Sequence, residues 1–116
     1  EHCKAQTYTK GLGALDRAAA LWIGEGQLPG SNDEGHLLYN LAEKAGVRFD
    51  QDDGETKVNT EVMNLFRRMQ GNLVDESCGT ASGYIAARDD VYEMIKWMTV
   101  PLIQNLIHHT KNVQND

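Results

Sequence analysis

The chain has 116 residues, of which 41% are hydrophobic and 24% charged, and its formal net charge is −6. This length suits a single compact domain over residues 1–116, and the apolar fraction is too high for a disordered chain. The acidic balance argues against nucleic acid as a partner, because its binding needs clustered cations, and it favours cations as ligands. No apolar run reaches the ~18–20 residues that cross a bilayer, so no membrane insertion is expected.

The first half of the chain carries two helical patterns. Residues 4–23 place apolar side chains at alternating spacings of three and four, which predicts an amphipathic helix that Gly24 ends. Ser31 and Glu34 then form a capping-box pattern in front of a second, short helix of about 12–14 residues. Gly46 is placed to stop that helix.

Two further helices are expected in the second half. Thr56 is the predicted N-cap of a third helix, whose apolar stripe consists of Val58, Val62, Leu65, Phe66, Met69 and Leu73. A fourth and longest helix covers 81–112. Pro101 predicts a kink or break at 97–98. No segment alternates like a strand, so the sequence predicts an all-α four-helix bundle with a long, kinked last helix. Its apolar heptad stripe consists of Tyr84, Val91, Ile95, Met98 and Leu102, with Arg88 among them.

Arg88 and the two cysteines raise the question of which side chains pair with each other. Arg88 lies on the predicted core stripe, and a buried guanidinium needs a carboxylate, so an ion pair with Asp16, Asp89 or Asp90 is favoured over an anion site. Cys3 and Cys78 fit no metal motif, and they are either a disulfide or two free thiols. A bridge between them would require one long crossover connection with two adjacent helices parallel, because disulfide Cα atoms lie within about 7 Å.

Metal ligation rests on two groups of side chains. His36 and Glu43 lie two helical turns apart on one face, and Glu34 precedes them, so the three could bind a transition metal. His108 and His109 form the second candidate, although neighbouring helical residues point about 100° apart and need help from another segment. The alternative is that these histidines are ordinary exposed or helix-end side chains.

Other chemistry has little support in the sequence. No Glu-x-x-His pair of a di-iron bundle occurs, and no nucleophile motif such as G-x-S-x-G is present, so we expect no enzyme. The acidic loop at 50–55 could bind calcium, but Glu55 stands where an EF-hand requires glycine. A solvated turn is therefore favoured over a calcium site.

Four stretches resemble an algal family of secreted proteins. They are 14–26 (ALDRAAALWIGEG), 35–43 (GHLLYNLAE), 57–66 (KVNTEVMNLF) and 98–104 (MTVPLIQ). They are similar, in order and spacing, to high-CO2-inducible and iron-assimilating periplasmic proteins. Members are longer and often carry cysteines near positions where Ala45 and Phe49 stand here. The resemblance implies a secreted, periplasmic or cell-surface domain linked to iron or inorganic carbon. The chain begins with Glu1 and no initiator Met, which fits a processed or excised piece.

Two functions follow as hypotheses. The first is an extracellular domain that captures iron or another cation such as calcium, with a metal ion as its partner. The second is a non-enzymatic structural subunit of an extracellular or membrane-associated assembly, either homo- or hetero-oligomeric. That second function predicts a contiguous exposed apolar patch formed by residues such as Ile23, Leu28, Trp97 and Ile107.

Overall fold

The computed structural model describes residues 12–24, 37–52, 54, 56–75 and 77–114, apart from the side chains of Leu12 and Cys78. Within these residues the chain forms no strand, so the predicted all-α class is confirmed. The elements are α1 (Leu12–Ile23), α2 (Leu38–Val47), α3 (Lys57–Val74), the short 3-10 turn η1 (Ser77–Gly79) and α4 (Ala81–Gln114). The predicted helical residues 4–11, the capping box of Ser31 and Glu34, and the pairing of Cys3 with Cys78 lie outside the described part.

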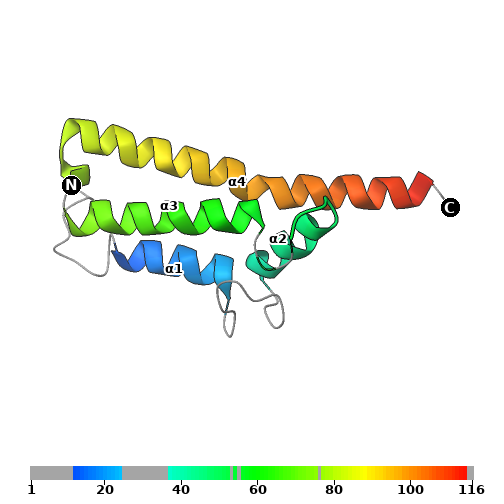
Figure 1. Cartoon of the computed structure of the whole chain (residues 1–116). Helices are drawn as coiled ribbons and strands as arrows, with labels where there is room; N and C mark the ends of the chain where they lie inside the picture. The colour runs from blue at the N-terminus through cyan, green and yellow to red at the C-terminus, as the bar shows by residue number, and fades with distance from the viewer. Residues whose placement is uncertain (1–11, 25–36, 53, 55, 76, 115–116) are drawn as a thin grey trace.

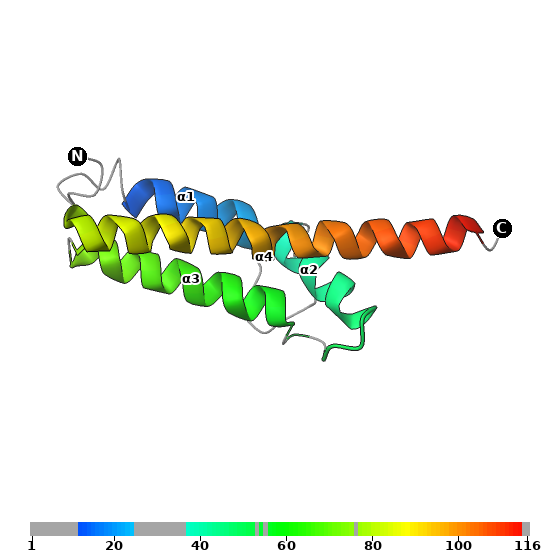
Figure 2. The same cartoon turned by 90° about the horizontal axis from the view of Figure 1, so that it is seen from above.

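The helices form a bundle of two long members, α3 and α4, and two short ones, α1 with 12 residues and α2 with 10. α1 and α4 run in the same direction, and α3 runs opposite to both (Figure 1). α2 is oblique and packs beside the second half of α4, which extends past α3 (Figure 2). The chain therefore measures 55 × 28 × 21 Å, and α2 does not form a fourth full-length side of the bundle.

The core joins all four helices because each contributes an apolar face at helical spacing. α3 supplies most of it, and the predicted stripe of this helix is confirmed except that Leu73 is only half-buried. Leu15, Ala19, Ile23, Met63, Trp97, Met98 and Val100 pack around the core at partial burial. The fully buried cluster consists of Trp22, Tyr39, Ala42, Val58, Val62, Leu65, Phe66, Met69 and Met94.

Two glycines determine where α1 ends and how closely α2 and α3 approach each other. Gly24 ends α1 as expected, with a φ of +83° that favours glycine, and its N–H donates to the Ala20 carbonyl at 2.9 Å. Gly46 does not stop α2, which continues to Val47. A Cβ added to Gly46 would overlap the methyl group of Thr56. Gly46 thus allows the start of α3 to approach α2 closely.

α4 has the predicted length but a different core face from the one predicted. It continues through Pro101 as one helix, and of the two predicted alternatives, a kink or a break, Figure 1 shows a shallow bend near its middle. It also turns a different face to the core, where Asp90, Met94 and Pro101 are buried. Ile95, which we expected in the core, is 53% exposed. Of the predicted apolar stripe of α4, only Met98 packs against the core, and the assignment of the other residues to the core is wrong.

Candidate functional site

A buried carboxylate lies where α2 meets the start of α3. Glu43 of α2 is fully buried, and its Oε1 accepts hydrogen bonds from the Thr56 hydroxyl at 2.8 Å and from the Asn59 amide at 2.6 Å. Its Oε2 accepts the backbone N–H of Gly54 at 2.9 Å. Three donors thus replace the water that this carboxylate loses on burial.

Asn59 extends this arrangement to α1. Its Oδ1 accepts the indole N–H of Trp22 at 3.0 Å, while its Nδ2 also donates to the Tyr39 carbonyl at 2.9 Å. We call Trp22, Asn59, Glu43 and Thr56 the polar network. It connects three helices through buried hydrogen bonds. Thr56 occupies the predicted N-cap position of α3, but its hydroxyl binds Glu43 and makes no capping bond.

The sequence did not predict this network, although one signal was present. Asn59 falls on the buried face of α3, three residues before Val62 and seven before Phe66. A polar residue on such a face needs a buried partner. Glu43 sits in the same way on the buried face of α2, four residues after Tyr39.

The predicted metal ligands are only partly described. Glu34 and His36 lie outside the described residues, and the Glu43 oxygens already accept three hydrogen bonds. His108 and His109 lie on the part of α4 beyond α3, with ring centroids 5.4 Å apart. In the described ranges no three His, Cys, Asp or Glu side chains gather as a metal site would require. The cation site remains a prediction.

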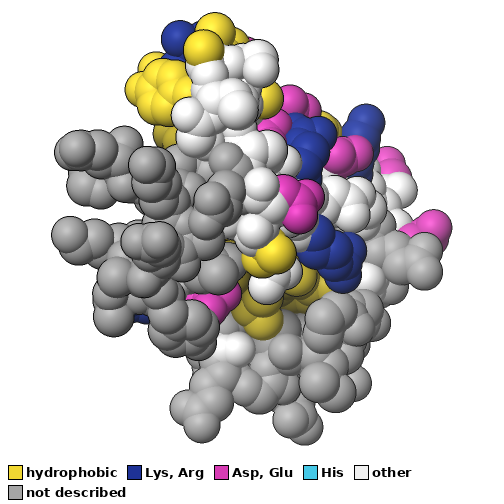
Figure 3. Space-filling view, turned by 90° about the vertical axis from the view of Figure 1, so that its left-hand side faces the viewer, with side chains coloured by type: hydrophobic (Ala, Val, Ile, Leu, Met, Phe, Trp, Pro, Cys, Tyr) yellow, Lys and Arg dark blue, Asp and Glu magenta, His cyan; other side chains and the backbone are white. Residues whose placement is uncertain are grey.

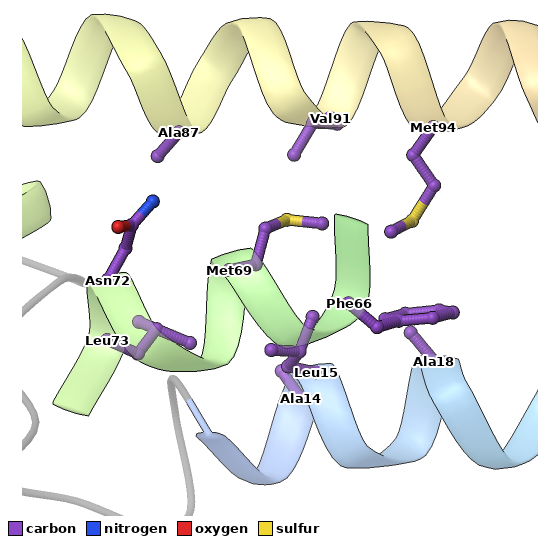
Figure 4. A pocket seen from close by; sticks show the side chains of 10 residues that line it. All are labelled: Ala14, Leu15, Ala18, Phe66, Met69, Asn72, Leu73, Ala87, Val91 and Met94. Atoms are coloured by element: carbon purple, nitrogen blue, oxygen red, sulfur yellow. The ribbon is translucent and has the colours of Figure 1, made fainter. Parts of the chain in front are cut away.

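An apolar groove of about 360 Å³ lies between α1 and α4, with α3 as its floor. No Cα atom of α1 lies within 8 Å of one in α4, so the two walls stand apart. Figure 4 shows Leu15 and Ala18 of α1 facing Val91 and Met94 of α4 across this space. The remaining lining residues are Ala14, Phe66, Met69, Asn72, Leu73 and Ala87. All are apolar except Asn72, so the groove suits a hydrocarbon surface better than a charged ligand.

An ion pair holds α3 against the first half of α4. Both Nε and Nη2 of Arg68 donate to the Asp90 carboxylate, with Nε at 3.0 Å from Oδ2. The hydrogen bond to Asp90 raises the pKa of Arg68 above its usual value, even though burial acts in the opposite direction. Arg88 pairs with Asp89, one of its three predicted partners, at 3.0 Å, but the predicted burial of this pair is wrong because both side chains are exposed.

Of the apolar residues that the sequence assigned to the core stripe of α4, Met98 packs against the core, whereas the others face outward. Leu106 and Val113 continue this outward face. We call Tyr84, Val91, Ile95, Leu102, Leu106 and Val113 the α4 stripe. Each of these six side chains exposes between 45% and 75% of its surface. Figure 3 shows hydrophobic atoms at the top of the molecule, over the first turns of α4, with charged side chains gathered to one side. Exposure on this scale is uncommon in a monomer and is typical of an interaction surface.

The apolar patch predicted for an assembly subunit has a different composition from the one expected. Ile23 and Trp97 pack against the core, and Leu28 lies outside the described residues. Only Ile107 is exposed, at 39%. The exposed apolar surface is formed by the α4 stripe, with further exposed side chains at Ile85, Tyr92 and Ile103.

Comparisons with known proteins return no match. No family model, no curated protein and no solved structure is similar to this chain. Among the described helices, none combines the length and apolar character that a bilayer crossing would need. Function must therefore be argued from the groove, the α4 stripe and the polar network.

Proposed function

We propose that this chain is a helical assembly domain, a non-enzymatic structural subunit that buries α4 against another helix. The observation that carries the proposal is the α4 stripe, which runs from Tyr84 to Val113 along one side of a 34-residue helix. An amphipathic helix gains stability mainly by covering such a face. The bundle covers a different face of α4, so a second helical surface remains for a partner.

The apolar groove supports the same function. Val91 belongs both to the groove and to the α4 stripe, so the two surfaces are continuous. On the α1 side, the groove is lined by the exposed Ala14 and Ala18. Their small side chains would let another helix approach closely. A helix docked there would cover all three of these side chains.

Replacing Leu106 by glutamate tests the proposal, because Leu106 is 68% exposed and contributes little to the fold. The protein isolated from its native source is expected to run as a species larger than the single chain, in light scattering and native electrophoresis. The Leu106→Glu variant, expressed in the same source, should shift to the mass of the single chain. Thr110→Glu, an exposed polar position on α4, is the matched control and should keep the larger mass. A native protein that runs as one chain would contradict the proposal.

Cation capture is the second candidate, and the net charge of −6 supports it. The resemblance to iron-assimilating proteins also supports a secreted, periplasmic or cell-surface setting. Calorimetric titration with ferric, ferrous and calcium ions is expected to release or absorb heat, and His36→Ala should reduce it more than His108→Ala does. No heat at millimolar ion would contradict cation capture without affecting the assembly proposal.

A further inference from the structure

The groove marks a corner of the bundle that none of the described helices fills. Figures 1 and 2 together place α1, α3 and α4 at three corners, with α3 adjacent to both of the others. α1 and α4 lie across the diagonal and make no close backbone approach. In a four-helix bundle a fourth helix would occupy the corner next to both. No other described helix lies there, because α2 packs beside the second half of α4.

The α4 stripe points toward that corner. On a helix of 3.6 residues per turn, Ile95 and Leu102 lie about 80–120° around α4 from the buried Met94 and Pro101. Neighbours in a square bundle stand about a right angle apart around each helix. Ala87 and Met94 line the groove between the two directions. The core face and the α4 stripe are thus the two faces that a bundle helix needs.

We propose that a second copy of this chain fills the corner, with the two α4 helices packed parallel along their stripes. This inference rests on the proposed function and names its partner. The occupant must present apolar side chains at spacings of three and four over the whole length of α4. α4 itself meets that requirement between Tyr84 and Leu102, where the spacing is that of a coiled-coil heptad.

The exposed area supports a stable pair. The six side chains of the α4 stripe each expose on the order of 100 Å², which is about three quarters of the roughly 800 Å² that a standard interface buries on each partner. The exposed Ala14 and Ala18, which line the groove, add to this area. A twofold axis parallel to the two α4 helices would also place the α4 of each copy over the groove of the other. The two grooves would then be filled by the same interaction.

The arrangement of the other helices selects the parallel direction. α2 and α3 pack on the same side of α4, at its second and first halves (Figure 2). In a parallel pair these helices lie on opposite outer sides and do not meet. In an antiparallel pair, α2 of one copy would occupy the space that α1 of the other fills. Parallel pairing brings Arg88 near its equivalent, but each is already paired with its own Asp89 at 3.0 Å.

Two variants with equal exposure test the surface. Leu102 belongs to the α4 stripe and Ile103 lies about 100° around the helix, and both are 55% exposed. Light scattering of the purified full chain is expected to give twice the chain mass of 12.9 kDa. Leu102→Glu should weaken the dimer at least about 100-fold, because two carboxylates would be buried face to face. Ile103→Glu should leave the dissociation constant within about threefold, and circular dichroism should show equal helix content in both variants.

Cysteines at positions 91 and 102 test the direction. A parallel, in-register pair brings every residue of the α4 stripe next to its own copy, whereas an antiparallel pair does so only at its axis, so oxidised Val91→Cys and oxidised Leu102→Cys should each form a covalent dimer. The unmodified chain, which carries the same Cys3 and Cys78, and Lys96→Cys, on the flank of α4, provide the background level. A dimer in which Val91→Cys or Leu102→Cys does not exceed this background would overturn parallel pairing.

The outcomes separate this inference from the assembly proposal. A purified chain that stays monomeric up to high concentration overturns self-pairing, and equal weakening of the dimer by Leu102→Glu and Ile103→Glu overturns the α4 stripe as its interface. If the native protein nevertheless runs as a larger species that Leu106→Glu disrupts, the assembly function stands and the partner is a different chain. If the native protein is a single chain, both proposals are wrong.

Discussion

Replacing Glu43 by alanine is expected to lower the free energy of unfolding by about 3–5 kcal/mol. The substitution removes the carboxylate that accepts three hydrogen bonds. The Thr56 hydroxyl, the Asn59 amide and the Gly54 N–H each lose their bond to it. Each buried donor without a partner costs about 1–3 kcal/mol. Urea unfolding followed by circular dichroism measures the change.

Glu43→Gln provides the control for this prediction. Glutamine keeps the volume and one acceptor oxygen, but its NH2 group faces donors, so a loss of roughly half that of alanine is expected. Because Asn59 serves the same network, Asn59→Ala combined with Glu43→Ala should cost less than the sum of the two single changes. A loss below about 1 kcal/mol for Glu43→Ala would mean that water replaces the carboxylate and that the network contributes little stability.

Replacing Gly83 by alanine is expected to cost about 2–4 kcal/mol, although alanine favours helix by about 1 kcal/mol over glycine. A Cβ at Gly83 would overlap the backbone carbonyl of Ser77. That carbonyl cannot move freely, since it accepts the Thr80 N–H at 3.1 Å and the Thr80 hydroxyl at 2.8 Å. The turn from η1 into α4 would therefore have to open.

Gly71→Ala is the matched control, because Gly71 lies on an exposed part of α3 with no atom within 4 Å of a Cβ. There the helix preference of alanine acts alone, and the free energy of unfolding should rise by about 0.5–1 kcal/mol. Thermal unfolding of both variants checks the opposite signs. A Gly83→Ala variant as stable as the unmodified chain would contradict the close packing of η1 on α4.

The sequence predicted α3 well and α4 poorly, and the reason is the number of faces that each helix covers. α3 has one apolar face, so its spacing identified Val58, Val62 and Phe66 as core. α4 has two, and the stronger pattern belongs to the face that the bundle leaves open. Periodicity finds an apolar face but does not tell which partner covers it.

Local rules failed where contacts between distant segments decide the structure. Gly46 looks like a helix stop, yet it serves the approach of Thr56, ten residues later. Arg88 was expected to need a buried carboxylate, whereas Asp90 pairs with Arg68 from another helix. Glu43 was identified as a candidate ligand because of its residue type. Its hydrogen bonds to Gly54, Thr56 and Asn59 depend on how α2 meets α3, which spacing alone does not give.

The indole of Trp22 gives the molecule a built-in optical reporter. It is 2% exposed and donates to Asn59 at the junction of three helices, so its fluorescence should be emitted at short wavelength in the folded chain. Trp97 is half-buried, with the Lys57 ammonium 5.6 Å from its ring centroid, and should emit at longer wavelength. In a Trp97→Phe background, the emission colour of Trp22 alone would then report whether the junction is closed, independently of helix content.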